Sequence, residues 1–457
     1  MVVQHNMQAA NANRMLNITS GAQSKSTEKL SSGYRINRAA DDAAGLSISE
    51  KMRKQIRGLD KASSNAQDGV SSVQTAEGAL TEVHSMLQRM NELATQAANG
   101  TNSTTDRSAI QDEISQLTTE IDRVAETTKF NETYLLKGDK GTKEVYMKGH
   151  DAGLNGSLTD NATSATFKVA AGALDAGKSV TIGGKDYTIG ATVAEAKKIA
   201  DDKKTTNGAK VTVNGVEYTS DGTDLKDAKN NVLDTSNIKA GDIVSDGTKT
   251  LTASDIDTAT GVDKSNSSVI SAAQAVKLMT TELTAANNIG TTKNAATVTA
   301  GTYASDTGVE FTINKGTAEV AEKLSFSLHV GSDADMTNKI TVGIETMNSS
   351  YLGIKGLNVN DDSGIAATYA VDAISDALQK VSDQRSSLGA VQNRLEHTID
   401  NLDNVVENTT SAESRIRDTD MAKEMVNYSK NNILAQAGQS MLAQANQSNQ
   451  GVLSLLQ

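Results

Sequence analysis

Apolar residues recur three and four residues apart in three long stretches of the chain. The positions of the first stretch are Val73, Ala76, Leu80, Val83, Leu87, Met90, Ala94 and Ala97. Those of the second are Ile110, Ile114, Leu117, Ile121 and Val124. Those of the third are Val371, Ile374, Leu378, Val381, Leu388, Val391, Leu395, Ile399 and Leu402, with Arg385 at one otherwise apolar position. This spacing places each set on one face of a helix, so it predicts three helices with coiled-coil seams.

A polar segment separates the first two predicted helices. Asn99-Gly100-Thr101-Asn102-Ser103 consists of residues that favour turns, so these two helices are predicted to run antiparallel. Each apolar stripe must be covered by another element, and no stripe has a partner of its own. We therefore predict one bundle that is closed by both ends of the chain.

The middle of the chain, residues 137–362, follows a different pattern. Gly, Thr, Asp, Asn and Lys are abundant there, and short alternating runs replace the heptads. Segments 180–187 and 211–218 are typical of β-hairpins, with two-residue turns at Gly183-Gly184 and Asn214-Gly215. A short helix-like run follows each of them, at 194–200 and 225–232. The pattern predicts a β-rich insert that contains a duplicated hairpin-plus-helix unit.

Both ends of the chain are almost free of charge. Arg14 is the only Lys, Arg, Asp or Glu among residues 1–24, and none follows Lys430. Disordered tails are the alternative, but such tails are usually charged and poor in large apolar residues. Because ordering costs ~1–2 kcal/mol per residue, we expect the thin apolar stripes to fold against each other and against neighbouring copies. The residues expected to drive this polymerisation are Leu16, Ile18, Leu30, Ile433, Leu434, Met441, Leu442, Val452, Leu453, Leu455 and Leu456.

Composition narrows the classes of function. The 457 residues include no Pro and no Cys, and their net charge is −12. Without Pro, long helices can run uninterrupted, and without Cys there is no disulfide or thiolate site. The negative charge argues against nucleic-acid binding. No run reaches the ~18 apolar residues of a membrane span, and residues 1–20 lack the pattern of a cleaved signal peptide, so composition alone predicts a cytoplasmic protein without membrane insertion.

The sequence contains no motif for catalysis or metal binding. The five histidines are scattered at His5, His84, His150, His329 and His397. None begins a His-Glu-x-x-His zinc motif, and no Ser or Thr has a base partnered by motif. We expect no enzymatic activity, no cofactor and no metal, and a hydrolase in the middle segment is the enzymatic alternative.

Two adjacent carboxylates, Asp41 and Asp42, could in principle serve in acid–base chemistry. Arg35 and Arg38 lie close to them in the sequence. A helix start favours negative charge, so we interpret the four residues as a charge-paired helix entry.

Three long motifs point to a family. The first is Leu30-Ser-Ser-Gly-Tyr-Arg-Ile-Asn-Arg-Ala-Ala-Asp-Asp-Ala-Ala-Gly-Leu-Ser-Ile-Ser49, the second is Arg385-Ser-Ser-Leu-Gly-Ala-Val-Gln-Asn-Arg-Leu395, and the third is Ser440-Met-Leu-Ala-Gln-Ala-Asn-Gln447 with Val452-Leu-Ser-Leu-Leu-Gln457. In this order they closely resemble bacterial flagellins, over residues 1–145 and 325–457. Ser327-Leu-His-Val-Gly331 looks like the strand that leads back into the family's second conserved domain. The sequence departs from the family's usual pattern at residues 3–8 and at Phe130-Asn131-Glu132, where Gly is common in place of Glu and where we expect only a turn to change.

The resemblance implies an α+β multidomain fold, in which the segment around Asp41 and Asp42 is a structural joint between the terminal domain and the bundle. Its long antiparallel helical bundle, or coiled coil, is formed by both chain ends, and a β-rich variable domain is inserted into it. The expected domains are residues 1–44 and 416–457 for the two halves of a terminal filament-core domain, 45–136 and 325–415 for a conserved bundle domain, and 137–324 for the variable outer domain.

The implied function is that of a structural subunit that polymerises with copies of itself into the extracellular flagellar filament for swimming. Flagellins leave the cell by type III export without a cleaved signal peptide, so the resemblance replaces the cytoplasmic prediction with a secreted one. The implied partners are a flagellar export chaperone, the filament cap, hook-associated proteins and Toll-like receptor 5 of a host. A hook–filament junction protein and a coiled-coil surface adhesin are the alternatives.

A stripe of residues beside the first seam is the candidate binding surface. Glu82, Met86, Arg89, Leu93 and Gln96 each come one position before a seam residue. We expect Leu93 and Met86 to be exposed next to Arg89, although the pattern alone favours an ordinary solvated helix face.

In flagellins similar to this chain, segments 88–93 and 110–114 form a surface that stacks on the next subunit and binds Toll-like receptor 5. Arg89 would be the polar anchor, Leu93 the apolar contact beside it, and Glu113 the charged partner on the next helix. Leu117 stands where some strongly stimulatory relatives carry Arg, so the potency toward the receptor stays open. The residues that the resemblance assigns to this surface are Gln88, Arg89, Glu92, Leu93, Gln96, Ile110, Glu113 and Leu117.

Overall fold

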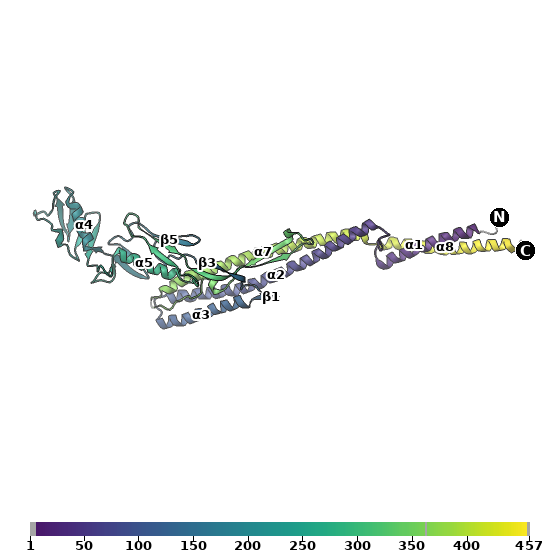
Figure 1. The fold of residues 1–457 in the computed structure, drawn as a ribbon, viewed down its shortest axis with the longest axis horizontal. Helices are drawn as coiled ribbons and strands as arrows, with labels where there is room; N and C mark the ends of the chain where they lie inside the picture. The colour runs from purple at the N-terminus through teal and green to yellow at the C-terminus, as the bar shows by residue number, and fades with distance from the viewer. Residues whose placement is uncertain (1–5, 362, 455–457) are drawn as a thin grey trace. The chain divides into compact units, whose positions relative to one another are not determined.

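The computed structural model describes residues 6–361 and 363–454, which fall into two compact units. The first unit comprises Met1–Ser71, Ser327–Thr341 and Val391–Gln457, and the second comprises Ser72–Phe326 and Val342–Ala390. Helices α2 (Ala43–Ala98) and α7 (Ile365–Arg417) contribute residues to both units. The predicted α+β fold, with helices from both chain ends and a β-rich middle, is confirmed (Figure 1). Among the described helices, none has the length and hydropathy to cross a membrane.

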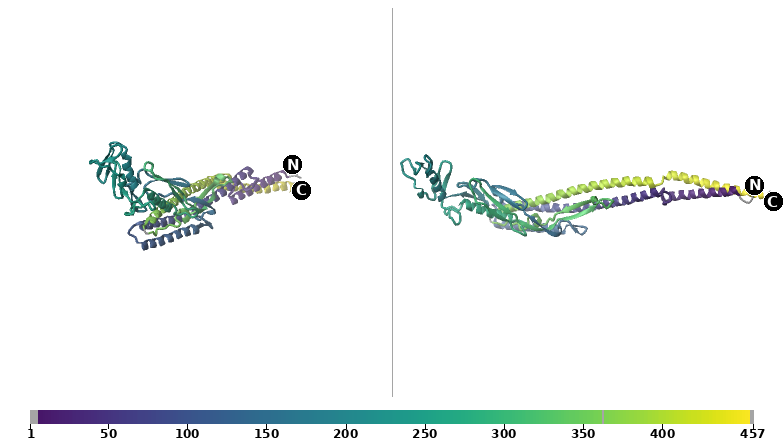
Figure 2. Two further views of the ribbon diagram at one scale, coloured as in Figure 1. Left: turned by 60° about the vertical axis from the view of Figure 1, so that its left-hand side comes forward. Right: turned by 45° about the horizontal axis from the view of Figure 1, so that its top comes forward.

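The first unit contains a helix pair and a small β-hairpin. Helices α1 (Met7–Ser32) and α8 (Met421–Ser454) lie side by side, with the start of α1 beside the end of α8 (Figures 1 and 2). Strands β18 (Leu324–His329) and β19 (Lys339–Ile344) pair with each other, so the predicted strand at 327–331 is present as far as His329. The hairpin contributes Val330 and Ile340 to a core with Ala66 of α2 and Leu395 of α7.

Carboxylates stabilise the entry to α2, but their hydrogen bonds differ from the predicted charge pairs. The Asp42 carboxylate accepts the backbone N–H of Gly45 at 2.8 Å and so satisfies a free donor in the first turn of α2. The Asp41 carboxylate accepts the backbone N–H of Arg38 at 3.0 Å, which lowers the pKa of Asp41. The predicted pairing with the Arg38 side chain is wrong, because that guanidinium binds Glu28 of α1 at 3.0 Å.

The first two predicted helix seams lie in the second unit, and the third continues into the first unit from Val391. Most of the seam positions are buried, but others, such as Leu117 and Leu378, are half-buried. The eight positions of the first seam, from Val73 to Ala97, are all fully buried. Helix α3 (Thr104–Thr127) follows the predicted turn and begins with a capping box formed by Ser103 and Asp106. Arg385, which interrupts the third seam, lies 3.6 Å from Glu77 of α2. The bundle therefore accommodates this polar position with an ion pair.

The middle of the chain forms several small sheets rather than one large one. The six-stranded sheet has the order β11 (Leu225–Lys226), β10 (Val216–Ser220), β9 (Lys210–Val213), β12 (Ile243–Ser245), β13 (Thr250–Ser254) and β8 (Ala191–Thr192). The four-stranded sheet has the order β15 (Thr297–Ala300), β16 (Val309–Asn314), β5 (Ser164–Val169) and β4 (Ser157–Asp160). A three-stranded sheet has the order β14 (Val269–Ile270), β7 (Lys185–Ile189) and β6 (Ser179–Ile182). Strand β1 (Lys129–Phe130) pairs with β2 (Thr133–Tyr134), and β3 (Asp139–Tyr146) pairs with β17 (Thr317–Glu322).

Helices cover these sheets. Helix α4 (Val193–Lys204) contributes Ala196 and Ala200 to the core of the six-stranded sheet. Helix α5 (Ala272–Asn287) packs Met279 among residues of the three- and four-stranded sheets, including Phe167 and Phe311. A short helix, α6 (Ser349–Leu352), precedes α7. The six-stranded sheet thus has an aliphatic core, whereas the core of the three- and four-stranded sheets also contains the two Phe rings and Tyr369 of α7.

The predicted duplication is confirmed only in part. Both hairpins are present, as β6–β7 and β9–β10, with positive φ angles in both turns. Helix α4 follows the first hairpin, but the helix predicted at 225–232 is wrong. Leu225 lies in β11, and the Asp227 carboxylate then accepts the backbone N–H groups of Lys229 and Asn231 at 2.8 Å each. These side-chain bonds favour a turn over a helix.

The first seam allows a test of the bundle's packing. Leu87 is fully buried, so Leu87→Ala removes apolar contacts and leaves a cavity. We expect it to lower the free energy of unfolding by about 2–5 kcal/mol, measured from the loss of helical circular dichroism in denaturant. The exposed neighbour Gln88 supplies the control, because Gln88→Ala should change little. If the two variants unfolded at the same denaturant concentration, the result would contradict this packing.

Glu132 lies in the turn between β1 and β2, at the position where the resemblance leads us to expect Gly. Asn131 and Glu132 have φ angles of 43° and 67°. Asn tolerates the left-handed region, whereas Glu is strained there by roughly 1–2 kcal/mol. Allowing for the extra freedom of Gly in the unfolded chain, we expect Glu132→Gly to stabilise the protein by about 0.5–1 kcal/mol in the same unfolding assay. Asn131→Gly is the control and should gain less, and a destabilising Glu132→Gly would show that the turn is not strained.

Candidate functional site

The α1–α8 pair is held by a polar contact at one end and by small residues along its length. Asn6 caps α1, and its Nδ2 donates to the backbone oxygen of Ala445 at 3.1 Å. Gly438 of α8 faces Leu16 of α1, and an added Cβ at this position would be in ordinary van der Waals contact with Leu16 Cδ1 at 3.4 Å. Ala435 and Ser26 are buried. The two helices therefore approach along a narrow antiparallel seam.

Of the seven predicted polymerisation residues whose side chains the structure describes, four are exposed and three are half-buried within one copy of the chain. Leu16, Leu30 and Leu442 are half-buried. Ile18, Ile433, Leu434 and Met441 are exposed, with 47–66% of their surface accessible. The side chains of Val452 and Leu453 and the whole of Leu455 and Leu456 lie outside the described residues.

A cleft of about 730 Å³ lies between α1 and α8. Met15 and Leu16 line it from α1, and Leu434 and Met441 line it from α8. The other lining residues are small or uncharged, and none of the residues that line it is charged. Such a surface suits contact with another apolar side chain and offers no group for acid–base chemistry.

The segment that connects α1 to α2 contacts the segment that connects α7 to α8. The backbone N–H of Arg35 donates to the oxygen of Arg417 at 2.6 Å, and that of Thr419 donates to Gly33 at 2.9 Å. The Arg417 guanidinium also lies 4.9 Å from the centre of the Tyr34 ring. The chain therefore fixes the start of α8 beside the end of α1 with polar contacts.

The second candidate surface lies on α2 and α3 and centres on Arg89. Its Nε donates to Glu113 at 2.9 Å and its Nη1 to Glu92 at 3.2 Å. Both hydrogen bonds raise the pKa of Arg89, and the one with Glu113 contributes most. Gln88 and Gln96 are exposed beside this group. The pairing of Arg89 with Glu113 that the resemblance implied is thus present within one chain.

The expected exposure of Leu93 is wrong. Leu93 is 2% exposed, and Ile110 of α3 is 6% exposed. The Arg89–Glu113 pair shows that α3 packs on this side of α2, and in an antiparallel pair the position one turn after Arg89 faces the one before Glu113. Leu93 and Ile110 therefore belong to the interior beneath the polar surface. Met86 and Leu117 are half-buried at its margin.

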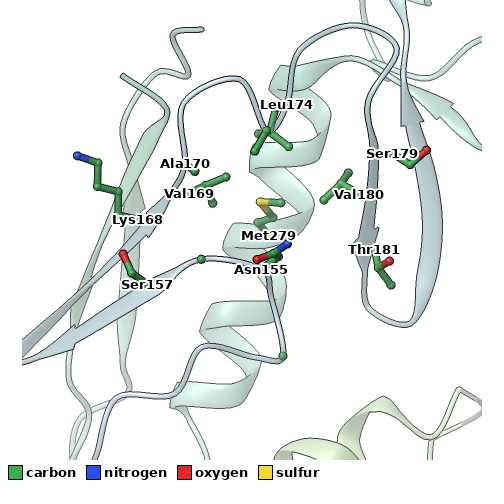
Figure 3. A pocket seen from close by; sticks show the side chains of 13 residues that line it. Asn155, Ser157, Lys168, Val169, Ala170, Leu174, Ser179, Val180, Thr181 and Met279 are labelled. Carbon is green, nitrogen blue, oxygen red and sulfur yellow. The ribbon is translucent and has the colours of Figure 1, made fainter. Parts of the chain in front are cut away.

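The β-rich middle contains a cavity of about 760 Å³. Figure 3 shows Met279 of α5 between the end of β5, with Val169, and strand β6, with Val180. Lys168 is the only ionisable residue among the described residues that line it, so the cavity brings no acid and base together. Across the described part of the chain, no group of His, Asp and Glu is arranged to hold a metal ion.

Comparisons with known proteins agree with the geometry of the helical ends. The family model for the bacterial flagellin N-terminal helical region matches residues 3–141, and that for the C-terminal helical region matches residues 371–456. A flagellin of Clostridium tyrobutyricum is 42% identical over 98% of this chain and 100% of its own length. A flagellin of Bacillus subtilis is 35% identical over 100% of both chains.

A solved structure, that of FliC from Burkholderia pseudomallei, covers 71% of this chain and 99% of its own at 21% identity. Its TM-score of 0.25 is too low to support an argument about the fold. The sequence relatives are sufficient, because they span the whole chain, and their names are those of structural filament proteins rather than enzymes. This chain belongs to the bacterial flagellin family and is a subunit of the flagellar filament.

Proposed function

We propose that the subunit polymerises through α1 and α8 into an extracellular filament used for swimming. The observation that carries this proposal is the distribution of apolar residues around α8. Ala435 and Leu442 are covered at least in part, whereas Ile433, Leu434 and Met441 are exposed. A helix that is apolar on more than one side is normally surrounded by other elements. One α1 helix cannot surround α8, so other copies of the chain cover the remaining faces.

Energetics favour this mode of assembly. Fully burying a large apolar side chain contributes roughly 1.5–3 kcal/mol, and each subunit offers several on these two helices. No Lys, Arg, Asp or Glu follows Lys430, so packing this part of α8 requires no desolvation of a charged side chain. The same exposed surface would aggregate before assembly. We therefore propose that an export chaperone covers it first, and that the filament cap and the hook-associated proteins meet it at the two ends of the filament.

Removing the end of α8 tests the assembly proposal. We expect deletion of residues 431–457 to abolish polymerisation from seeded monomers, because the outward-facing Ile433, Leu434 and Met441 are lost together. The seams of α2, α3 and α7 do not depend on this segment, so circular dichroism should show that these helices remain. Filaments of the truncated chain in electron micrographs would refute assembly through α8.

We further propose that the exposed polar surface around Arg89 contacts the next subunit and, on free monomers, Toll-like receptor 5. Arg89 supports this role because Glu92 and Glu113 hold its guanidinium in place while about half of the side chain stays exposed. A preorganised Arg combines a planar set of donors with an apolar stem, which makes it a frequent hot spot. In this proposal Leu93 makes no direct contact with a partner. Its buried side chain packs α2 against α3 beneath the polar surface.

An alanine variant tests the receptor proposal. We expect Arg89→Ala to weaken binding of the monomer to the receptor ectodomain by roughly 30-fold or more, the scale of a hot-spot truncation. Arg53→Ala is the matched control, since Arg53 also lies on α2 and pairs with a Glu three residues away. Titrations by calorimetry should show a near-normal affinity for the control. Equal affinities for both variants would exclude Arg89 from the receptor site.

A further inference from the structure

We propose that the methionines of α1 and α8 form a peroxide-sensitive modification site, and that their conversion to sulfoxides reversibly blocks the addition of subunits to the filament. This inference rests on the proposed assembly through α1 and α8. It adds a chemical control that neither the family match nor the relatives describe.

The exposure of the methionines differs sharply between the helix pair and the rest of the described chain. The methionines of the pair are all 48–74% exposed: Met7, Met15, Met421, Met425 and Met441. Those in the bundle and the sheets are buried or half-buried, and the fully covered ones are Met90, Met147, Met279 and Met347. Met336, in the short 3₁₀ helix Met336–Asn338, is the single other exposed methionine among the described residues. An oxidant in solution therefore reaches mainly the surface that assembly must bury.

The sequence contains no competing sulfur. It has 13 Met and no Cys, so the thioethers are the only sulfur groups that can be oxidised. A peroxide transfers one oxygen atom to the thioether, which loses two electrons and becomes a sulfoxide, while the peroxide is reduced to water or an alcohol. A reductase supplied with thiols reverses the step, giving back the thioether with a disulfide and water.

A sulfoxide is unsuited to the surface that these methionines form. Met15 and Met441 line the cleft between α1 and α8 together with Leu16 and Leu434. Oxidation converts a flexible apolar side chain into a polar one with a strong hydrogen-bond acceptor. The lining residues carry amide and hydroxyl donors but no charged donor, and a sulfoxide buried at an apolar contact with another copy loses its hydrogen bonds to water unless one of these neutral groups reaches it. Packing another copy against the oxidised cleft is therefore opposed, while the buried seams of the monomer are unaffected.

The test compares purified full-length monomer before and after brief treatment with dilute hydrogen peroxide. Peptide mass spectrometry locates the sulfoxides, circular dichroism checks the helices, and seeded polymerisation gives the critical concentration. We expect sulfoxides mainly in α1, in α8 and at Met336, unchanged helicity, and a critical concentration raised at least tenfold. Treatment with both stereospecific methionine sulfoxide reductases and a thiol should restore polymerisation. Preformed filaments should be oxidised more slowly than monomers at the five helix positions.

Two variants show which methionines are responsible for the loss of assembly after peroxide treatment. Met336→Leu removes the exposed methionine outside the pair, and its assembly should still fail after peroxide. A variant with Leu at all five helix positions is compared only with itself, before and after peroxide, and its critical concentration should not change. If that variant does not assemble, the reductase rescue of the wild-type chain decides. Normal assembly of wild-type monomer that carries the five sulfoxides, or no rescue by the reductases, would overturn the proposal. Failure of untreated wild-type monomer to assemble would instead count against the assembly proposal itself.

Discussion

The structure depends on one imbalance, which is that α1 and α8 carry more apolar surface than either can cover for the other. Two helices in contact bury one face each, and α8 has large apolar residues on more than that face, including Ile433 and Leu434. The proposed assembly would supply the missing cover from other copies of the chain. A filament would do so repeatedly, because every added copy would cover its neighbours and present the same surface again. In that proposal, assembly and the folding of the two ends are parts of one process.

The second unit solves the same physical problem within one chain. Its first seam is complete, since the positions from Val73 to Ala97 are fully buried. Polar residues at its margins are paired, as Arg385 is with Glu77 and Arg89 with Glu113. A body closed in this way can present a defined polar surface to a partner without changing its own packing. In the functions proposed above, the closed bundle would serve recognition and the open helix pair would serve polymerisation.

The bundle could be predicted from the sequence because its signal is local and repeated. A seam of eight positions with heptad spacing leaves little freedom in which face is buried. Leu93 was predicted wrongly for a related reason: it flanks the seam of α2, and only the position of α3 decides whether that flank is covered. Spacing along one helix contains no information about how wide a stripe its neighbours will bury.

The middle of the chain was harder to predict because polar interactions between residues close together in the sequence determine its structure. The hairpins were recognisable from Gly183-Gly184 and Asn214-Gly215, where the backbone requires positive φ angles. The run after the second hairpin resembled a helix in composition, but the carboxylate of Asp227 binds nearby backbone N–H groups and closes a turn. Helix α5 was not predicted. Its buried residues, from Ala275 to Ala286, are three and four apart and follow a Ser that caps the helix, a signal that was hidden in a segment rich in Ala and Thr.

Backbone contacts link the end of α1 to the start of α8, and they leave the rest of both helices available for the proposed assembly. Residues Gly33 and Arg35 bind the chain at Arg417 and Thr419 through backbone hydrogen bonds. Such contacts fix direction, yet they bury little apolar surface, and a net contribution of ~1 kcal/mol per hydrogen bond is small against the entropy of ordering two helices. These contacts therefore fix the direction of α1 against α8, whereas the packing along the pair rests on small residues such as Ala435 and Gly438. In the proposed filament, neighbouring subunits would add the apolar cover that this narrow seam lacks.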